Sequence, residues 1–222
     1  MGLFSRKKTF KIRDVEFYSD SEYHYSKGLS KSSLKKEIKI VKQDLSLENL
    51  GHILQYLVEF IQDEKPDIKA GNKVTCFTWL ILFHEVSPDF FEILEIIPEQ
   101  QGFAEGLTRT LHVLHQQLFV CDQLKIEPDF PHGDQMVAVD PLTKTGSPVN
   151  LFRWKSEFPD SGWVVMTNEF DEEKMPFEEM TLIELMILRP EIVKFMALPM
   201  GYKVIWDGND AKIAFDNYLV EN

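Results

Sequence analysis

Cysteine is scarce in this sequence, whose 222 residues include only Cys76 and Cys121. Each lies in an apolar segment, where a free cysteine behaves as a small hydrophobic residue. Two cysteines cannot staple a chain of this length. The basic start, MGLFSRKKTFKIRD, is not followed by the apolar segment of a secretory signal. The sequence therefore predicts a protein of the reducing cytoplasm.

A long hydrophobic run is also missing. The main apolar stretch, from Val74 to Phe83, is shorter than the roughly 20 residues that a helix needs to cross a bilayer, and it is predicted as a buried strand. Gly2 does not fit a myristoylation motif, because Arg6 stands where Ser or Thr is required. Phe4 and the basic residues beside it would contact an anionic membrane only weakly. We therefore expect no stable membrane anchoring.

Catalytic and cofactor-binding motifs are absent from the sequence. It contains no G-x-S-x-G elbow, no phosphate-binding P-loop and no G-x-G-x-x-G fingerprint. Cys121 and His115 are six residues apart on a predicted helix, so their side chains point roughly 120° apart at 100° per residue. The sequence thus predicts no cofactor, no catalytic residue and no enzyme.

Two histidines offer the best alternative to that prediction. His112 and His115 share a face of the long predicted helix, and Glu105 and Asp122 lie near that face. No HExxH motif, cysteine pair or clear third ligand accompanies them, and structural zinc sites need four ligands. We predict no metal site here, and an enzyme with a His112/His115 site remains an alternative.

Charge is distributed unevenly around a formal net charge of −12. Residues 1–42 carry 11 Lys and Arg against 5 Asp and Glu, whereas the remaining residues carry 13 against 31. Such an acidic body repels nucleic acid and attracts basic proteins. Acidity that merely keeps the protein soluble explains the same numbers, so both interpretations stay open.

Hydrophobic patterns predict the elements of the first two thirds. The alternation in Lys36–Val41 indicates a strand, and helical spacing indicates a helix over 46–62 with Ser46 as its cap. Residues 73–86 are predicted as one long strand, paired antiparallel with a strand at Phe90–Ile97. Apolar residues at intervals of four and three then predict a long helix over 102–124.

The final third mixes short strands with a helix. Strands are predicted at 136–139, 149–154 and 161–167, and Thr181 with Glu184 forms a capping box that opens a helix. Pro190 suits the first turn of another helix, and a β-hairpin with the turn DGND closes the chain. The whole pattern predicts an α+β fold, with a mixed or antiparallel sheet packed by a few helices and a C-terminal β-hairpin.

Three regions follow from these patterns. Residues 1–34 are predicted as a basic N-terminal arm of loops with at most an edge strand, and residues 35–148 as an α+β body. Residues 149–222 form a C-terminal unit, which we expect to pack on the body as one compact domain. The weakest signal lies between 126 and 148, where Pro, Gly and Asp are frequent.

Short motifs in the C-terminal unit resemble a known family. They are Ser161-Gly162-Trp163, then Pro190, then Leu198-Pro199 followed by Gly201-Tyr202. Between Val149 and Asp216 the sequence resembles immunity family thirty-three, one of the immunity-protein families of bacterial polymorphic toxin systems. The resemblance implies a non-enzymatic protein that binds and neutralises a cognate toxin. A cytoplasmic adaptor protein is a further alternative.

Acidic residues of the same unit are the candidate contacts with such a partner, which we expect to be a basic protein. Exposed acidic loops seldom hold the perturbed pKa values that catalysis needs, but they steer basic partners. Tyr202 is added as an aromatic anchor, because charges at the rim of an interface contribute little affinity. The predicted partner-binding residues are Glu169, Asp171, Glu172, Glu173, Glu178, Glu179, Tyr202, Asp207 and Asp210.

Overall fold

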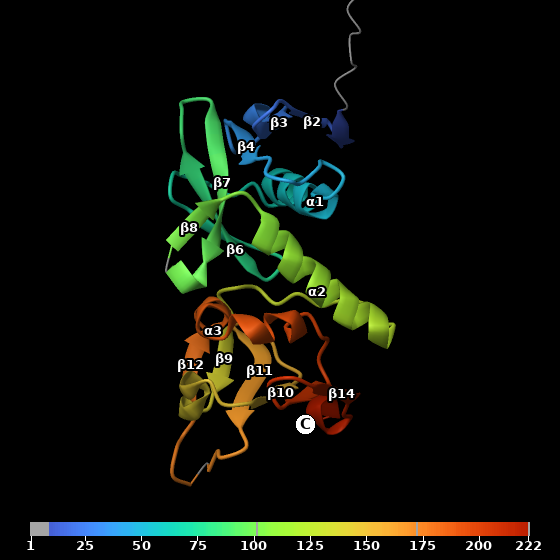
Figure 1. Ribbon diagram of the computed structural model, residues 1–222, viewed down its shortest axis with the longest axis vertical. Helices are drawn as coiled ribbons and strands as arrows, with labels where there is room; N and C mark the ends of the chain where they lie inside the picture. The colour runs from blue at the N-terminus through green and yellow to red at the C-terminus, as the bar shows by residue number, and fades with distance from the viewer. Residues whose placement is uncertain (1–8, 101, 172, 222) are drawn as a thin grey trace, which may run out of the picture. The chain divides into compact units, whose positions relative to one another are not determined.

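The structure, a computed structural model, describes residues 9–100, 102–171 and 173–221. The chain divides into two compact units. The N-terminal unit comprises Met1–Cys76 and Leu80–His112, and the C-terminal unit comprises Phe77–Trp79 and Val113–Asn222. Each unit combines a sheet with helices (Figure 1), and the predicted α+β class is confirmed.

An eight-stranded sheet organises the described part of the N-terminal unit, with the order β1-β2-β3-β4-β7-β6-β5 and β8 paired to β7. Most neighbours are antiparallel, whereas β4 and β7 are parallel. The strands are β1 (Phe10–Ile12), β2 (Val15–Ser19), β3 (Tyr23–Lys27), β4 (Glu37–Val41), β5 (Lys73–Cys76), β6 (Trp79–Glu85), β7 (Phe90–Ile97) and β8 (Gly102–Glu105).

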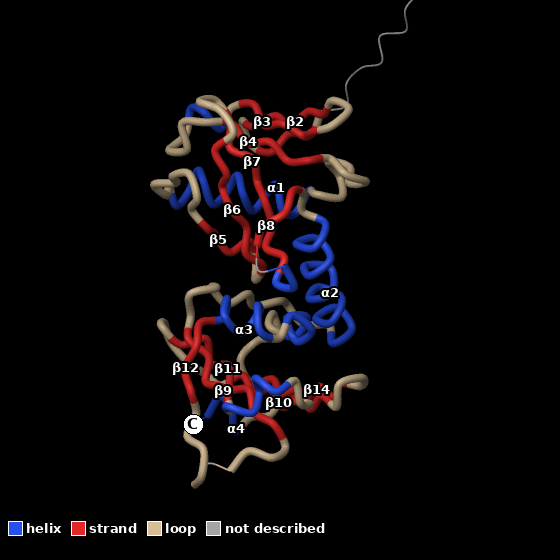
Figure 2. The backbone as a smooth tube through the Cα atoms, turned by 60° about the vertical axis from the view of Figure 1, so that its left-hand side comes forward, coloured by secondary structure: helices blue, strands red, loops and turns tan. Residues whose placement is uncertain are grey.

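The helix α1 (Gly51–Glu59) lies against this sheet and continues into a π-helical turn, η2 (Phe60–Glu64) (Figures 1 and 2). Its apolar stripe, which includes Ile53, Leu54 and Leu57, is fully buried, as the helical spacing predicts. The predicted cap is wrong: the N-cap position is Leu50. The Ser46 hydroxyl instead bonds the Asn49 side chain at 2.9 Å, which forms a turn before the helix.

The predicted basic arm was expected to contain loops and at most an edge strand, and this expectation is wrong for residues 10–27. They form β1, β2 and β3 at one edge of the sheet. Val15, Phe17, His24 and Ser26 are buried, so the strands do alternate. Two of the four buried residues are polar, which hid the alternation. The first eight residues lie outside the described part of the chain.

The predicted long strand over 73–86 is two strands, β5 and β6. Phe77 interrupts it with a positive φ of 56°, a conformation that non-glycine residues rarely adopt. β6 pairs antiparallel with β7, with Leu82 opposite Leu94, which confirms the predicted pairing. The segment Phe77–Trp79 belongs to the C-terminal unit, where Phe77 packs on Phe130 with ring centroids 5.0 Å apart.

The predicted long helix begins later than expected. Residues Gly102–Glu105 form β8, and α2 spans Thr108–Leu124. The buried carboxylate of Glu95 accepts the backbone amides of Arg109 at 2.9 Å and Thr110 at 2.6 Å, which satisfies the first turn of α2. The division between the units falls between His112 and Val113, earlier than the weak region at 126–148.

A six-stranded sheet organises the described part of the C-terminal unit, in the order β12-β9-β11-β10-β13-β14. β9 and β11 are parallel and the other neighbours are antiparallel. The strands are β9 (Met136–Val139), β10 (Val149–Arg153), β11 (Asp160–Thr167), β12 (Glu178–Thr181), β13 (Tyr202–Trp206) and β14 (Ala211–Phe215).

Helices cover one face of this second sheet. They are α3 (Leu182–Leu188), which lies by β9 and β12 in Figure 1, and the 3-10 helix η5 (Pro190–Phe195). A further 3-10 helix, η4 (Pro141–Thr145), follows β9, and the short α4 (Tyr218–Glu221) ends the chain. The Thr181–Glu184 capping box, Pro190 in the first turn of η5 and the β13–β14 hairpin are all confirmed.

Alternation gives this sheet two distinct faces. On the covered face, Trp163, Val165, Leu151 and Val204 are at most 1% exposed. The opposite face, called here the open face, keeps partial solvent exposure. It carries Ala138, Asn150, Phe152, Val164, Met166, Lys203, Ile205, Lys212 and Ala214. An exposed face with this much apolar surface is able to contact another molecule.

Candidate partner-binding surface

The motifs that carry the family resemblance meet around one buried guanidinium, that of Arg153 at the end of β10. Arg153 is 2% exposed. It donates to the carbonyl oxygen of Asp129 at 2.7 Å and to that of Leu198, and its Nη2 lies 3.0 Å from the Asp129 carboxylate. Burial lowers the pKa of Arg153, and the Asp129 carboxylate opposes that shift. Composition alone gave no signal for this residue.

Two further motif residues, Trp163 and Gly201, lie next to Arg153. The indole of Trp163 donates to the Met196 carbonyl oxygen at 3.3 Å, and the Arg153 guanidinium lies 5.6 Å from the Trp163 ring centroid. Gly201, with a φ of +93°, donates its amide to the Arg153 carbonyl oxygen at 2.7 Å. These motif residues therefore form the structural centre of the unit.

Both predicted acidic segments emerge at one end of the second sheet. β11 and β13 run in the same direction, because each is antiparallel to β10. Thr167 pairs with Val149, and Ile205 pairs with Asn150, so the two strands end level. Two strand spacings separate them, which is about 10 Å. The loop 168–177 and the turn 207–210 follow these ends, and together they form what we call the acidic end.

Within the loop, Glu169 and Glu173 are exposed. Asp171 forms an ion pair with Lys174, and its carbonyl oxygen accepts the Met175 amide at 2.8 Å. Phe170 and Phe177 pack together with ring centroids 4.4 Å apart, which closes the loop on itself. Glu172, also predicted as a contact, lies outside the described residues.

Asp207 has a structural role in the hairpin turn. Its carboxylate accepts the backbone amides of Asn209 at 2.9 Å and Asp210 at 2.8 Å. These two hydrogen bonds lower the pKa of Asp207. The side chain of Asp210 is exposed, and it is therefore the better placed of the two for a partner.

Glu178 and Glu179 point to opposite faces of β12, because successive strand residues alternate. Glu178 forms an ion pair with Lys144 of η4. Glu179 lies opposite Ala138, which lies opposite Val164, and this row places Glu179 on the open face. Among the described residues, no ion pair involves the Glu179 carboxylate.

The structure does not bring Tyr202 to the acidic end. Tyr202 begins β13, four residues and about 14 Å from Trp206 at about 3.4 Å per residue. It lies on the covered face, where its ring contacts Phe215 with centroids 5.4 Å apart. An aromatic anchor for the acidic end must come from another residue.

His112 and His115 are both exposed on α2. The described residues contain no group of three or more His, Cys, Asp or Glu placed to hold a metal ion. Cys76 and Cys121 are buried free thiols, and burial raises the pKa of each. Raised thiol pKa values disfavour the nucleophilic thiolate.

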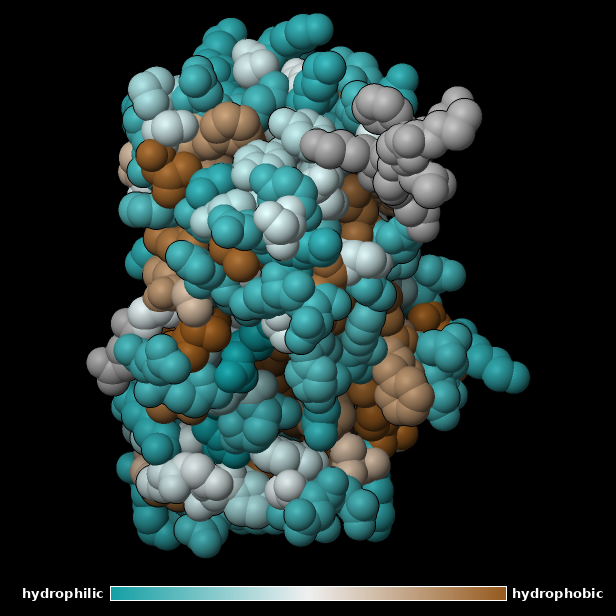
Figure 3. Space-filling view, turned by 45° about the horizontal axis from the view of Figure 1, so that its top comes forward, coloured by the Kyte–Doolittle hydropathy of each residue, from teal (hydrophilic) through white to brown (hydrophobic). Residues whose placement is uncertain are grey.

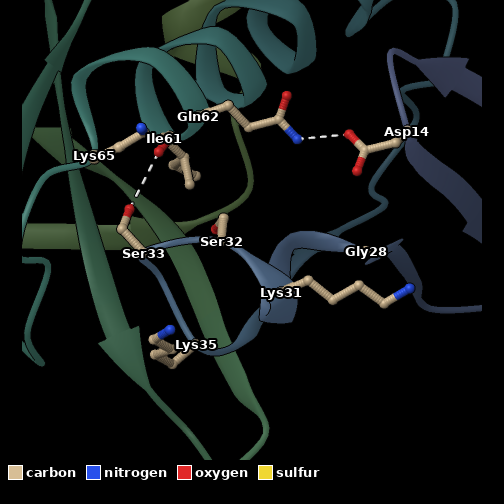
Figure 4. Close-up of a pocket in the computed structure, with 9 residues that line it drawn as sticks. All are labelled: Asp14, Gly28, Lys31, Ser32, Ser33, Lys35, Ile61, Gln62 and Lys65. Carbon is tan, nitrogen blue, oxygen red and sulfur yellow. Dashed lines mark hydrogen bonds between the residues drawn. The ribbon is translucent and has the colours of Figure 1, made fainter.

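A pocket of about 450 Å³ in the N-terminal unit was missed by sequence reasoning. Lys31, Lys35 and Lys65 line it (Figure 4), and no described residue forms an ion pair with them. Their ammonium groups point in different directions in Figure 4. The Ser32 and Ser33 hydroxyls donate to the carbonyl oxygens of Leu29 and Ile61. The hydrogen-bond donors that line this pocket therefore do not converge on one anion.

On the face drawn in Figure 3, hydrophilic side chains predominate and hydrophobic ones form separate patches. Within the described residues, no helix has both the length and the apolar character needed to span a membrane.

Comparison with known proteins supports the sequence resemblance. The family model of the Imm33-like domain matches residues 116–216. The match starts inside α2, well before the predicted start at Val149, and reaches the residue after β14. No curated protein and no solved structure shows significant similarity to the chain. Residues 116–216 are therefore similar to the Imm33-like domain, and residues 1–115 lie outside the match.

Proposed function

We propose that this chain is an immunity protein that binds and neutralises a cognate bacterial toxin. The observation that carries the proposal is the match of residues 116–216 to the Imm33-like domain. That segment lies wholly within the C-terminal unit. On this proposal the protein works in the cytoplasm by occupying the toxin, without a catalytic step of its own.

The acidic end supports a basic partner. Glu169, Glu173 and Asp210 are exposed there, and the described residues offer them no ion pair. Clustered carboxylates raise the rate at which a basic protein arrives, whereas affinity depends on buried anchors. We therefore assign the acidic end to the encounter with the toxin.

The experiment uses the product of the coding sequence next to this gene. Its toxicity on expression in a bacterial host is measured with and without this chain, and binding of the two purified proteins is measured by calorimetry. We expect rescue of growth and a stoichiometric complex. Growth inhibition that this chain fails to relieve, together with no complex, would overturn the proposal.

A further inference from the structure

A pocket of about 260 Å³ opens on the open face of the second sheet. Ala138 and Val164 line it from β9 and β11, and Trp154 lines it from the residue after β10. Two acidic residues, Glu179 on β12 and Asp160 at the start of β11, also line it. All of these residues lie within the match to the Imm33-like domain. The volume is below the roughly 300–1,000 Å³ of pockets for whole small molecules, and it suits a single side chain.

The Ser-Gly-Trp motif builds this pocket. The Ser161 hydroxyl donates to the Met136 carbonyl oxygen at 2.7 Å, and Trp163 is buried on the covered face. Gly162 between them has a φ of +78°, and a Cβ there would lie 2.1 Å from the Trp154 carbonyl oxygen. The β11–β9 register shifts between Asp160 and Val164. Because residue 162 has no side chain, Trp154 can approach β11 this closely and line the pocket next to the shifted register.

Polar and apolar groups are separated within the pocket. Ala138 and Val164 are apolar, and Trp154 adds an aromatic ring that also contacts Tyr218, with ring centroids 5.6 Å apart. Glu179 and Asp160 provide the negative charge, and the described residues include no cation paired with either carboxylate. A neutral side chain in this pocket would leave two carboxylates desolvated without a partner, which is unfavourable.

An arginine side chain satisfies every part of this arrangement. Its methylene groups pack on apolar surface. Its planar guanidinium stacks on an aromatic ring and donates two parallel hydrogen bonds to a carboxylate. Lysine offers a strongly hydrated point charge that cannot form the paired hydrogen bonds. We propose that this pocket receives an arginine side chain of the toxin, an assignment of the anchor that rests on the proposed function.

The pocket is tested without the toxin by a short blocked peptide, acetyl-Gly-Arg-Gly-amide. A second peptide replaces arginine with citrulline, which keeps the shape and removes the charge. Binding is followed by NMR through the amide signals of Gly162, Val164 and Glu179 and the indole signal of Trp154. We expect saturable shifts at these positions with a Kd on the order of 1 mM, at least fivefold weaker for citrulline and for the Glu179→Gln variant.

Glu173→Gln is the matched control, because it removes one exposed carboxylate from the acidic end and leaves the pocket intact. The inference is overturned if the citrulline peptide binds as well as the arginine peptide. It is equally overturned if Glu173→Gln weakens binding as much as Glu179→Gln does.

Failure of this inference is distinguishable from failure of the proposed function. If the toxin binds and dissociates equally fast from the parent chain and from Glu179→Gln, the pocket is not the anchor and the immunity function stands. If the arginine peptide binds as expected but the adjacent gene's product neither binds nor is neutralised, guanidinium recognition stands and the proposed function is wrong.

Discussion

Trp154 and Gly162 are joined by a hydrogen bond of 2.8 Å from the Trp154 amide to the Gly162 carbonyl oxygen. At the same place, a Cβ on residue 162 would lie 2.1 Å from the Trp154 carbonyl oxygen and 2.8 Å from the Ser156 hydroxyl. Backbone atoms cannot move aside cheaply, so only glycine fits. The Ser-Gly-Trp motif thus serves both the fold and the pocket.

Gly162→Ala should therefore destabilise the chain by about 2–4 kcal/mol, because strain at positive φ adds to steric overlap. Gly146→Ala is the matched control, since Gly146 has a similar φ of +81° with nothing within 4 Å of its Cβ position. The control substitution should lower the free energy of unfolding by only about 1 kcal/mol. Urea unfolding monitored by tryptophan fluorescence measures both, and equal losses would contradict the steric explanation.

Arg153→Met should destabilise the chain by about 3 kcal/mol, because buried carbonyl oxygens and a carboxylate lose their donor. Lys212→Met, at an exposed position of the same sheet, should change the free energy of unfolding by less than about 0.5 kcal/mol. If Arg153→Met does not fold, the milder Asp129→Asn variant should still lower the unfolding midpoint. A near-neutral result for both would show that the guanidinium does not organise the unit.

The double variant His112→Ala, His115→Ala should leave the free energy of unfolding within about 0.5 kcal/mol of the parent value, because both side chains are exposed. Chemical unfolding and elemental analysis of the purified protein are the measurements. Stoichiometric zinc that disappears in the double variant would contradict this expectation and support the enzyme alternative.

The stability of the N-terminal unit should depend on pH through Glu37. Burial alone would raise the pKa of Glu37, but hydrogen bonds from Ser26, Ser30 and the Gly28 amide outweigh it and lower that pKa below its ordinary value. A lowered folded-state pKa contributes stability that is present above the unfolded pKa and is lost as pH falls through the folded pKa.

Glu37→Gln should consequently lower the unfolding midpoint at pH 7, and the difference from the parent chain should shrink as the pH is lowered below 4. Glu22→Gln is the control, because Glu22 is exposed and no described residue bonds its side chain. A loss that stays constant between pH 7 and pH 3 would show that the carboxylate charge is not responsible.

Local patterns predicted the C-terminal unit better than the N-terminal one, for physical reasons. The Thr181–Glu184 capping box and the β13–β14 hairpin depend on residues close in sequence. The strands β1–β3 depend on distant partners, and buried His24 and Ser26 break their apolar alternation. His24 is satisfied by Ser19 and by the Leu45 carbonyl oxygen, which the sequence around it does not show.

The candidate site could be predicted only in part from the sequence, because it also depends on contacts between distant segments. The acidic loop and the hairpin turn are visible in the sequence, but their position at one end of the sheet depends on the order β11-β10-β13. Arg153 and the pocket at Gly162 depend on contacts between segments such as 129, 153, 162 and 198. Tyr202 was expected beside the acidic turn, yet strand geometry places it at the opposite end of β13.

Charge at the acidic end should control how fast the proposed toxin associates. Reversing Glu169, Glu173 and Asp210 to lysine should reduce the association rate about tenfold at low salt, because steering by clustered charge is lost. Asp207 is left intact, since it holds the turn through the amides of Asn209 and Asp210. Association with the adjacent gene's product is measured by stopped-flow fluorescence at two salt concentrations.

A control chain reverses three exposed acidic residues of the N-terminal unit, Glu22, Glu64 and Glu105, so that both variants have the same net charge. If local steering operates, only the acidic-end variant loses most of the rate and of its salt dependence. Added salt should narrow the difference in association rate between the two variants, because screening reduces charge interactions beyond about 8 Å at physiological ionic strength. Equal rates for the two variants at both salt concentrations would mean that the toxin responds to net charge alone and that the acidic end serves solubility.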